Sequence, residues 1–316
     1  MTGTDSQYHG VLLYDKAPGI SSHDAVAHLR RTLHQRKIGH TGTLDPLAEG
    51  LLVMCLGRAT KIARFLSGFD KTYQAEVCLG QVSSTLDGEG VDKTQVPQPV
   101  PDMTEPAWCR LLDTFQGRIS QKVPAYSAVK VDGRRLYDLA RRGVPVTVPE
   151  REIDIREIQL LGYKQPRLSL KITCSSGTYI RSLAAAIGER VGCGAYLSHL
   201  RRLAVGDMMI DEALTAEQTV RCHADGTLHQ HLLDIETVLE YSTVTVSDEF
   251  RNGVLSGKTL TGPDILQVQG DFTVGDRLLL KDTDGRVLAV GTAEATTAAF
   301  KNRSQDNLFS YLRVLN

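Results

Sequence analysis

Asp45 is the residue of this sequence that is best placed to do chemistry. It lies in residues 39–50, which read Gly-His-Thr-Gly-Thr-Leu-Asp-Pro-Leu-Ala-Glu-Gly. Because Pro46 follows it, the backbone of Asp45 is pushed towards an extended conformation, and the flanking glycines allow a ligand to approach closely. A carboxylate on such a loop is a candidate nucleophile or proton-transfer group. The residues alone favour the plainer alternative, a turn aspartate that hydrogen-bonds its own loop.

The elements before Asp45 are predicted from local patterns. Residues 11–14 form a short apolar run and are predicted to be a strand. Ser21 and Asp24 resemble a capping box, and the helical spacing of the apolar residues that follow predicts a helix that ends in the basic residues 36–37. Residues 38–52 contain so many helix and strand breakers that we expect an ordered loop.

Two further elements could bring side chains to this loop. Residues 73–80 alternate between apolar and polar side chains, which predicts a half-buried strand that begins at Tyr73. A second alternating run, 168–174, leads through a Ser-Ser-Gly-Thr turn into a helical pattern that stops at Gly192. This strand–turn–helix unit places Tyr179 and Arg181 in the first turn of the helix.

The texture of the chain changes near residue 243. We therefore expect an N-terminal domain over 1–242 and a C-terminal domain over 243–316, which is small but large enough to fold. A Thr-Asp-Gly turn at 283–285 predicts a hairpin in the second domain. Its expected strands are 243–246, 276–281, 286–291 and 309–314.

Bulk properties exclude several classes of protein. The chain of 316 residues is 41% hydrophobic and 23% charged, and its formal net charge is −1. It has no apolar run near the roughly 20 residues that cross a bilayer, and no secretory leader, so we expect a cytoplasmic protein. The scattered cysteines are expected to be free thiols.

Cofactor and metal motifs are missing from the sequence. It has no Gly-x-Gly-x-x-Gly motif and no P-loop, the patterns that would point to a dinucleotide or a nucleoside triphosphate. A group of Cys222, His223, His229 and His231 matches no zinc spacing that we would accept, and a polar linker is the favoured interpretation.

Residues 118–151 form a local basic segment. They contain eight basic and three acidic side chains, a net charge of +5, interleaved with Tyr126 and Tyr137. Such a composition suits a surface that binds RNA, although most charged runs are simply solvated faces.

Several motifs occur in one order along the chain and carry a family resemblance. The loop Gly-His-Thr-Gly-Thr-Leu-Asp-Pro-Leu-Ala-x-Gly resembles the signature of the bacterial tRNA pseudouridine-55 synthases (the TruB family). The matching segments around it are Asp15-Lys16 through Gly19, Lys71-Thr72-Tyr73, Gly177-Thr178-Tyr179-Ile180-Arg181 and Leu200-Arg201-Arg202-Leu203. The similarity extends from about residue 9 to about residue 207 and is weaker beyond.

The resemblance implies a fold and an activity. The fold would be α+β, a mixed β-sheet catalytic domain with flanking helices, followed by a small all-β PUA-like domain that binds RNA. The activity would be the isomerisation of uridine 55 in the T-loop of tRNA, with Asp45 as the catalytic carboxylate. Because this reaction involves no redox change and no hydrolysis, the resemblance implies neither a cofactor nor a metal. Asp45 could attack the sugar or the base, or remove a proton from the ribose, and the sequence leaves these routes open. The target base must leave its stack, so a base-flipping pocket is expected.

The same resemblance assigns roles to further residues. Tyr73 would stack on the flipped base and Arg181 would pair with Asp45; an ordinary strand aromatic and a surface arginine are the plain alternatives. His40 would enter the T-loop, Leu200 would form an apolar pocket wall or simply pack in the core, and Tyr179 would contact the substrate. The basic segment 118–151 would be an insertion that clamps the tRNA, with Lys130 and Arg141 on its backbone.

Two departures from the family pattern and two rival functions remain. The turn reads Lys16-Ala17-Pro18-Gly19 where the family usually has Lys-Pro-x-Gly, and Glu49, expected to face solvent, replaces a small or neutral residue. The expected partner is the T-arm of tRNA, with no membrane and no obligate protein partner, so a monomer is predicted. The rivals are a guide-RNA-dependent pseudouridine synthase and a tRNA-folding chaperone.

Overall fold

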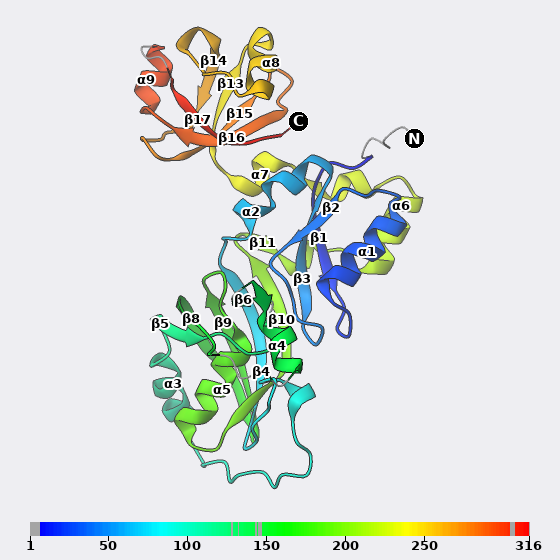
Figure 1. Ribbon diagram of the computed structural model, residues 1–316, viewed down its shortest axis with the longest axis vertical. Helices are drawn as coiled ribbons and strands as arrows, with labels where there is room; N and C mark the ends of the chain where they lie inside the picture. The colour runs from blue at the N-terminus through cyan, green and yellow to red at the C-terminus, as the bar shows by residue number, and fades with distance from the viewer. Residues whose placement is uncertain are drawn as a thin grey trace.

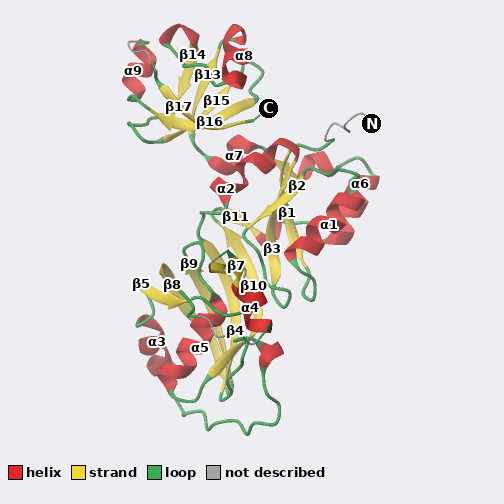
Figure 2. Cartoon of the chain, viewed as in Figure 1, coloured by secondary structure: helices red, strands yellow, loops and turns green. Residues whose placement is uncertain are grey.

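The described part of the protein has two large β-sheets with helices packed around them, and a third sheet of only two short strands (Figure 1). The computed structural model describes residues 7–127, 129–131, 133–142, 144, 147–303 and 307–315, with only the backbone of Lys130 and Arg135. Figure 2 shows the smaller sheet at one end of an elongated molecule, with the larger sheet running through the rest. Among the described residues, none of the helices combines the length and the apolar character that a bilayer crossing requires.

The larger sheet is mixed, and its strand order is β12-β1-β3-β10-β4-β9-β8-β5, with β2 added to β3 and β11 to β10. Its one parallel pairing among the described residues joins β3 to β10, and the other pairs are antiparallel. The strands are β1 (Gly10–Lys16), β2 (Ile38–Thr41), β3 (Glu49–Leu56), β4 (Lys71–Leu79), β5 (Gly117–Lys122), β8 (Glu150–Lys164), β9 (Arg167–Cys174), β10 (Ala195–Val205), β11 (Met208–Met209) and β12 (Leu232–Leu233).

Helices cover this sheet at both ends. Figure 1 shows α1 and α6 beside β1 and β3, and α3 and α5 beside β8, β9 and β4. They bury the apolar side chains of the alternating strands in a common core. The helices are α1 (Ser22–Thr32), α2 (Ala63–Leu66), α3 (Glu105–Asp113), α5 (Ile180–Val191), α6 (Ala216–Ala224) and α7 (Ile235–Leu239).

Helix α1 begins as predicted and ends early. Ser21 and Asp24 form the capping box, with the Asp24 amide donating to Ser21 Oγ at 3.1 Å. The prediction that the helix continues to residues 36–37 was wrong. The helix ends at Thr32, and His34 follows with a φ of 49°. This is a left-handed backbone angle, which a right-handed α-helix cannot contain.

The prediction that residues 38–52 form only a loop was also wrong. Strands β2 and β3 occupy both ends of this segment, and only residues 42–48 form a loop. Gly50 misled the prediction, because its φ is 99° and a Cβ there would lie 2.4 Å from the carbonyl oxygen of Arg202. The glycine serves the close approach of β10 rather than a break in the strand.

The basic segment 118–151 begins and ends in the sheet. Strands β5 and β8 pair antiparallel, with Lys122 opposite Glu150. Between them lie a short hairpin of β6 (Lys130–Val131) and β7 (Arg134–Arg135) and the helix α4 (Leu136–Arg141). The insertion therefore projects from paired strands.

The smaller sheet has the order β14-β13-β15-β16-β17. The four predicted strands and the hairpin at 283–285 are present, and two short helices accompany them, which the all-β expectation did not include. The elements are β13 (Ser242–Val246), α8 (Asp248–Ser256), β14 (Ile265–Gln269), β15 (Arg277–Lys281), β16 (Val287–Ala293), α9 (Thr297–Asn302) and β17 (Phe309–Val314).

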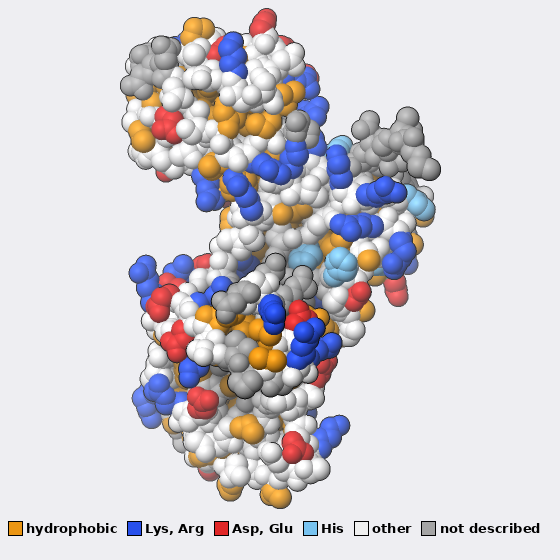
Figure 3. Space-filling view, viewed as in Figure 1, with side chains coloured by type: hydrophobic (Ala, Val, Ile, Leu, Met, Phe, Trp, Pro, Cys, Tyr) orange, Lys and Arg blue, Asp and Glu red, His pale blue; other side chains and the backbone are white. Residues whose placement is uncertain are grey.

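The two sheets share an apolar core. Phe65 and Leu66 of α2 belong to the same buried cluster as Leu279, Val290 and Leu315 of the C-terminal unit. Hydrophobic burial of this kind holds the two units together. Figure 3 shows that cationic side chains gather on the surface beside this junction.

Candidate active site

A pocket of about 410 Å³ opens beside the loop that carries Asp45. Its walls come from the β2–β3 loop, the segment after α2, the strands β4 and β10, the insertion and the start of α5. The lining residues are 42–45, Ser67, Lys71, Tyr73, Ser127, Val129, 177–181, Leu200 and Arg202. Segments that are more than 150 residues apart in the sequence therefore meet at one cavity.

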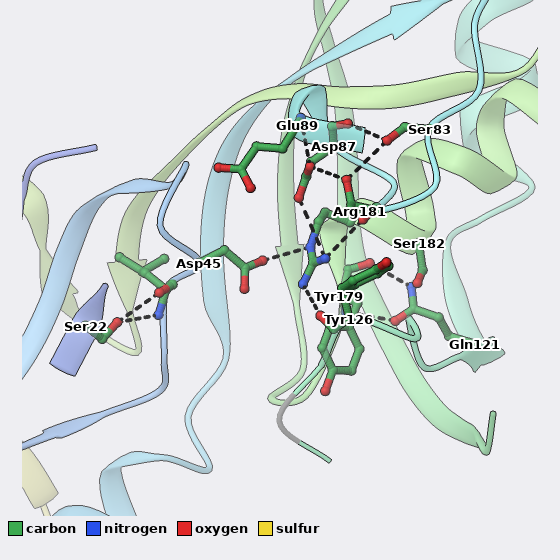
Figure 4. Close-up of polar contacts among 12 residues, drawn as sticks. Ser22, Asp45, Ser83, Asp87, Glu89, Gln121, Tyr126, Tyr179, Arg181 and Ser182 are labelled. Atoms are coloured by element: carbon green, nitrogen blue, oxygen red, sulfur yellow. Dashed lines mark hydrogen bonds and ion pairs between the residues drawn. The ribbon is translucent and has the colours of Figure 1, made fainter. Parts of the chain in front are cut away.

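Asp45 and Arg181 form an ion pair at this pocket. Arg181 Nε lies 2.8 Å from Asp45 Oδ2, and Figure 4 shows the carboxylate of Asp45 pointing at the guanidinium. The Arg181 side chain is only 5% exposed, whereas that of Asp45 is 37% exposed. The arginine is thus fixed inside the protein, and the carboxylate is presented to the cavity.

The backbone on both sides of Asp45 is held in place. Ser22 Oγ accepts from the Leu44 amide at 2.8 Å and donates to the Leu44 carbonyl at 3.0 Å. On the other side, the Gly19 amide donates to the Pro46 carbonyl at 2.8 Å. The turn Lys16-Ala17-Pro18-Gly19 therefore contacts the Asp45 loop through Gly19, even though its proline stands one position later than in the family pattern.

Lys16 stabilises that turn. It is fully buried, and its Nζ donates to the carbonyls of Ala17 and Ile20 at 2.9 and 2.8 Å. Burial lowers its pKa, and the nearby carboxylate of Asp45 acts in the opposite direction. Lys16 therefore stabilises the turn through its hydrogen bonds, and its charge interacts with the carboxylate of Asp45.

Arg181 is held by three further groups. Its Nη1 donates to the Thr85 carbonyl and its Nη2 to the Tyr126 carbonyl, both at 3.1 Å. A second carboxylate, Asp87, lies with its Oδ2 3.7 Å from Nη1 and is almost completely buried. Asp87 was not among the predicted site residues, because nothing in its local sequence separates it from an ordinary turn aspartate.

Tyr73 forms part of the pocket and faces β10. It lies in β4 directly opposite Arg202, and its side chain is largely buried. Burial raises the pKa of its phenol, and this effect outweighs the opposing charge and hydrogen bond of Arg202. The ring is therefore a neutral, apolar surface against which a planar base can stack.

Arg202 connects the two ends of the Asp45 loop. Its Nε donates to the Leu51 carbonyl at 2.6 Å and its Nη2 to the Gly42 carbonyl at 2.9 Å, and the residue is 1% exposed. Although Arg202 belongs to the motif Leu200-Arg201-Arg202-Leu203, it was not among the predicted site residues. No local signal reveals it, because its partners lie about 150 positions earlier in the chain.

Lys71 is a further buried cation in the pocket wall, beside Arg181 and Arg202. Its Nζ donates to the carbonyls of Ser67 and Phe69 at 2.7 and 2.5 Å. Burial, together with the charge of Arg202, lowers its pKa from 10.5 to about 8. Lys71 was not among the predicted site residues either, although it stands in the motif Lys71-Thr72-Tyr73.

The expectation that Glu49 faces solvent was wrong. Glu49 Oε1 lies 3.1 Å from Arg201 Nη1 and 3.3 Å from His199 Nε2. Arg201 also bonds Asp15 Oδ2 at 2.8 Å through Nη2. Because β3 and β10 run in parallel at this point, Glu49 lies opposite Arg201 of the neighbouring strand and pairs with it, and only 21% of its side chain stays exposed.

The remaining predicted residues divide into two groups. Leu200 and Tyr179 line the pocket, and the backbone of Tyr179 is held by both side-chain atoms of Gln121, at 2.8 and 3.1 Å. His40 lies in β2 and is not among the pocket-lining residues; burial and the charges of Arg202 and His23 lower its pKa. The structure therefore brings Asp45, Tyr73, Arg181, Leu200 and Tyr179 together and leaves His40 outside.

The insertion contributes a wall and a stacked cation. Ser127 and Val129 line the pocket, and the exposed Arg141 lies with its guanidinium carbon 5.3 Å from the ring centroid of Tyr137. The side chain of Lys130 lies outside the described residues. In the histidine group far from this site, His223 contacts the hydroxyl of Tyr8 and His229 the carbonyl of Gly226.

Family models match the chain in three consecutive parts. Residues 30–180 match the TruB family pseudouridylate synthase N-terminal domain, and residues 181–240 match the tRNA pseudouridylate synthase B C-terminal domain. Residues 242–306 match the PUA domain.

Curated relatives cover most of the chain. The tRNA pseudouridine synthase B of Xanthomonas axonopodis is 46% identical over 285 residues, which is 88% of this chain and 92% of the relative. The protein of the same name from Bacillus pumilus is 36% identical over 316 residues, 98% of each chain.

Two solved structures share the fold of the whole chain. One is an H/ACA RNP bound to a substrate RNA containing 2′-deoxyuridine, with a TM-score of 0.75, 23% identity, and coverage of 100% of this chain and 92% of that one. A Cbf5-Nop10-Gar1 complex gives a TM-score of 0.73 at 24% identity, and 100% and 91% coverage. At this identity, the likeness shows the fold alone.

Proposed function

The chain belongs to the TruB family of tRNA pseudouridine synthases, and within that activity we propose that it isomerises uridine 55 of the T-loop with Asp45 as the catalytic carboxylate. The observation that carries this proposal is the Asp45–Arg181 ion pair at the pocket. An exposed carboxylate oriented by a buried arginine is arranged for contact with a bound substrate.

The reaction is an isomerisation, so the enzyme adds no atoms to the uridine and has mainly to position it. The N1–C1′ bond of uridine breaks, the base turns, and C5 bonds to C1′; C5 loses a proton and N1 gains one. Asp45 can assist by attacking the sugar or the base, or by removing a proton from the ribose. In each route Arg181 and the anchored loop hold the carboxylate in one direction, which keeps the entropic cost of alignment low.

The pocket accounts for the handling of the flipped base. A cavity of about 410 Å³ suits a single nucleotide and excludes a duplex, so the uridine must leave its stack to enter. Tyr73 then stacks on the base, Leu200 covers its edge, and Tyr179 contacts the nucleotide. His40 stands apart and would fill the space that the nucleotide leaves in the T-loop.

The insertion completes the binding of the T-arm. It supplies Ser127 and Val129 to the pocket wall, so an RNA held by the insertion is also held over Asp45. Lys130 and Arg141 contact the phosphates, which makes binding dependent on salt. We further propose that the enzyme acts as a monomer in the cytoplasm, a compartment that suits its free thiols.

The two rival functions are less well supported. Action within a guide-RNA complex would need relatives of that kind at high identity, whereas the relatives at 36–46% identity carry the name tRNA pseudouridine synthase B. A chaperone that only refolds tRNA needs no carboxylate held by a buried arginine. A chaperone activity can nevertheless coexist with the isomerisation.

The test uses an unmodified tRNA transcript. After incubation with the protein, pseudouridine is mapped by carbodiimide-dependent primer extension. We expect a stop at position 55 with the wild-type protein and with Asp113→Asn, an exposed aspartate at the end of α3. Asp45→Asn should give less than about one thousandth of the wild-type rate.

Each part of the proposal can fail separately in this assay. Full activity of Asp45→Asn would overturn the catalytic assignment. A stop at another uridine would overturn the assignment of position 55. Binding and refolding of the tRNA without any product would favour the chaperone.

A further inference from the structure

Gln121 lies near the end of β5, where the insertion leaves the sheet. Its side chain is only 6% exposed, whereas the other residues of β5 are half-buried or exposed. A buried amide is unfavourable unless both its donor and its acceptor find partners. The partners of Gln121 lie in the segment that carries Arg181.

The amide of Gln121 bonds both backbone groups of Tyr179. Its Oε1 accepts from the Tyr179 amide at 2.8 Å, and its Nε2 donates to the Tyr179 carbonyl at 3.1 Å. Figure 4 shows the side chain of Gln121 directed at Tyr179. The two residues are 58 positions apart in the sequence, so this contact depends on the tertiary fold.

Tyr179 is the N-cap residue of α5, the helix that carries Arg181 in its first turn. Its backbone is extended, with φ −100° and ψ 106°, and its own side chain makes no capping hydrogen bond. A short polar side chain usually stabilises this position of a helix. Here Gln121 of another strand holds the N-cap residue through two hydrogen bonds instead. The direction of the first turn of α5 therefore depends on Gln121.

The residues that follow Gln121 contact the same turn of α5. Ser182 Oγ donates to the Lys122 carbonyl at 3.0 Å. Arg181 Nη2 donates to the Tyr126 carbonyl at 3.1 Å. The beginning of the insertion therefore lies along the first turn of α5.

The other strand at the base of the insertion holds the turn before α5. Arg151 of β8 lies opposite Gln121, and its Nη1 donates to the Gly177 carbonyl at 3.1 Å. Its guanidinium carbon lies 5.9 Å from the ring centroid of Tyr179. Arg151 is exposed, and a long exposed side chain loses more entropy for less gain than a buried amide with two partners. Gln121 is therefore the stronger of the two contacts.

The ion pair at the pocket requires this placement. Arg181 Nε lies 2.8 Å from Asp45 Oδ2, and the arginine side chain is 5% exposed. Because the side chain is packed inside the protein, a shift of the helix start moves the guanidinium with it. A misplacement of about 1 Å can lower a rate on the order of 100-fold. A residue that fixes the N-cap of α5 thus affects the reaction without contacting the substrate.

We propose that Gln121 is a positioning residue, which fixes the first turn of α5 so that Arg181 holds the carboxylate of Asp45 in its reactive direction. This inference rests on the proposed role of Asp45. It gives the base of the insertion a second task beside the proposed binding of RNA, because β5 then determines the geometry of the reaction centre. The competing interpretation is that Gln121 only joins β5 to α5 and matters for folding alone.

The test compares single-turnover pseudouridine formation, the tRNA Kd and circular dichroism of two variants. Gln121→Met keeps the approximate size of the side chain and makes neither bond, and Gln121→Asn keeps the amide on a side chain too short to make both. In each, the rate should fall about 10- to 100-fold, with the Kd within about 3-fold of wild type. The matched control is Gln159→Met, an exposed glutamine of β8, which should keep the wild-type rate.

A double variant separates positioning from a role in folding alone. If Gln121 acts through Arg181, its replacement should matter little once Arg181 is absent. In the Arg181→Met background, Gln121→Met should therefore lower the rate by less than about 3-fold. A contribution to folding alone predicts the same fold-loss in both backgrounds, and that result would overturn the inference.

The remaining outcomes are equally decisive. A wild-type rate in both single variants, or loss of the folded state in both, would also overturn the positioning role of Gln121. An active Asp45→Asn would overturn the proposed role of Asp45 whatever the rates of the Gln121 variants, so the two failures are distinguishable.

Discussion

Arg181 reaches Asp45 with its Nε atom, at 2.8 Å, while its two Nη atoms donate to the carbonyls of Thr85 and Tyr126. The guanidinium plane is therefore fixed by the backbone before any substrate binds. Because a lysine has no rigid fork of donors, it cannot satisfy the three partners together.

Replacement of Arg181 should consequently affect the reaction more than binding. For Arg181→Lys and Arg181→Met, kcat for tRNA should fall about 10²- to 10³-fold, with the tRNA Kd within a few-fold of wild type. Single-turnover kinetics and filter binding measure the two quantities. Arg190→Met, an exposed arginine near the end of the same helix, is the control. Equal losses in both quantities would contradict a role in orienting Asp45.

Tyr73 should act mainly through its ring. In Tyr73→Leu the flat surface is lost and kcat should fall at least about 100-fold, whereas Tyr73→Phe keeps the ring and should retain more activity. Some loss is expected in Tyr73→Phe, because Arg202 then lacks the phenol as a partner. Rates measured under saturating enzyme rank the three proteins, and a leucine variant as active as the phenylalanine variant would exclude stacking.

Arg202 should stabilise the loop that carries Asp45. Arg202→Met leaves the buried carbonyls of Gly42 and Leu51 without their donors, so the free energy of unfolding should fall by about 2–4 kcal/mol. The neighbouring Arg201→Met removes partly exposed ion pairs and should lower it by about 1 kcal/mol or less. Urea unfolding compares the two, and equal losses would rule out the special role of Arg202.

Lys71 should make the free energy of unfolding depend on pH in the alkaline range. Its folded pKa of about 8 lies below the ordinary 10.5, so between these values the unfolded chain binds the extra proton. The charge of Lys71 thus destabilises the fold below pH 8, and this penalty disappears as the pH rises towards 10.

The measurement is the difference in unfolding free energy between the wild-type protein and Lys71→Met. From pH 7 to pH 10 it should shift in favour of wild type by about 2–3 kcal/mol. Lys164→Met, an exposed lysine in β8, should show no such shift. Parallel pH curves for Lys71→Met and wild type would contradict the lowered pKa.

Local patterns predicted those elements whose burial alternates along the chain. Strand β4 follows the expected alternation, and α5 begins after the predicted turn and ends at Gly192, whose φ is 86°. The long strand β8 was missed, because its exposed and buried residues do not alternate cleanly. Gly50 was read as a breaker, because the strand that requires it lies 150 residues away.

Residues of the pocket, like the elements of the fold, could be predicted only where the signal lies in a local stretch of sequence. Asp45, Tyr73 and Arg181 could be found because each stands in a contiguous motif. Asp87 and Arg202 could not, since their roles depend on contacts with distant segments. Glu49 was misplaced for the same reason, as its partner Arg201 lies on a strand that pairs with β3 only after folding.

The bridge from Arg202 to the Asp45 loop also determines when the pocket can form during synthesis. The loop and β3 leave the ribosome about 150 residues before β10 does. Until Arg202 has been made, the carbonyls of Gly42 and Leu51 therefore lack the donors that they have in the folded protein. Closing so long a stretch of chain is slow and entropically costly. A nascent chain shorter than about 200 residues therefore contains Asp45 but lacks Arg202, so the pocket beside Asp45 forms only after most of the larger sheet has been made.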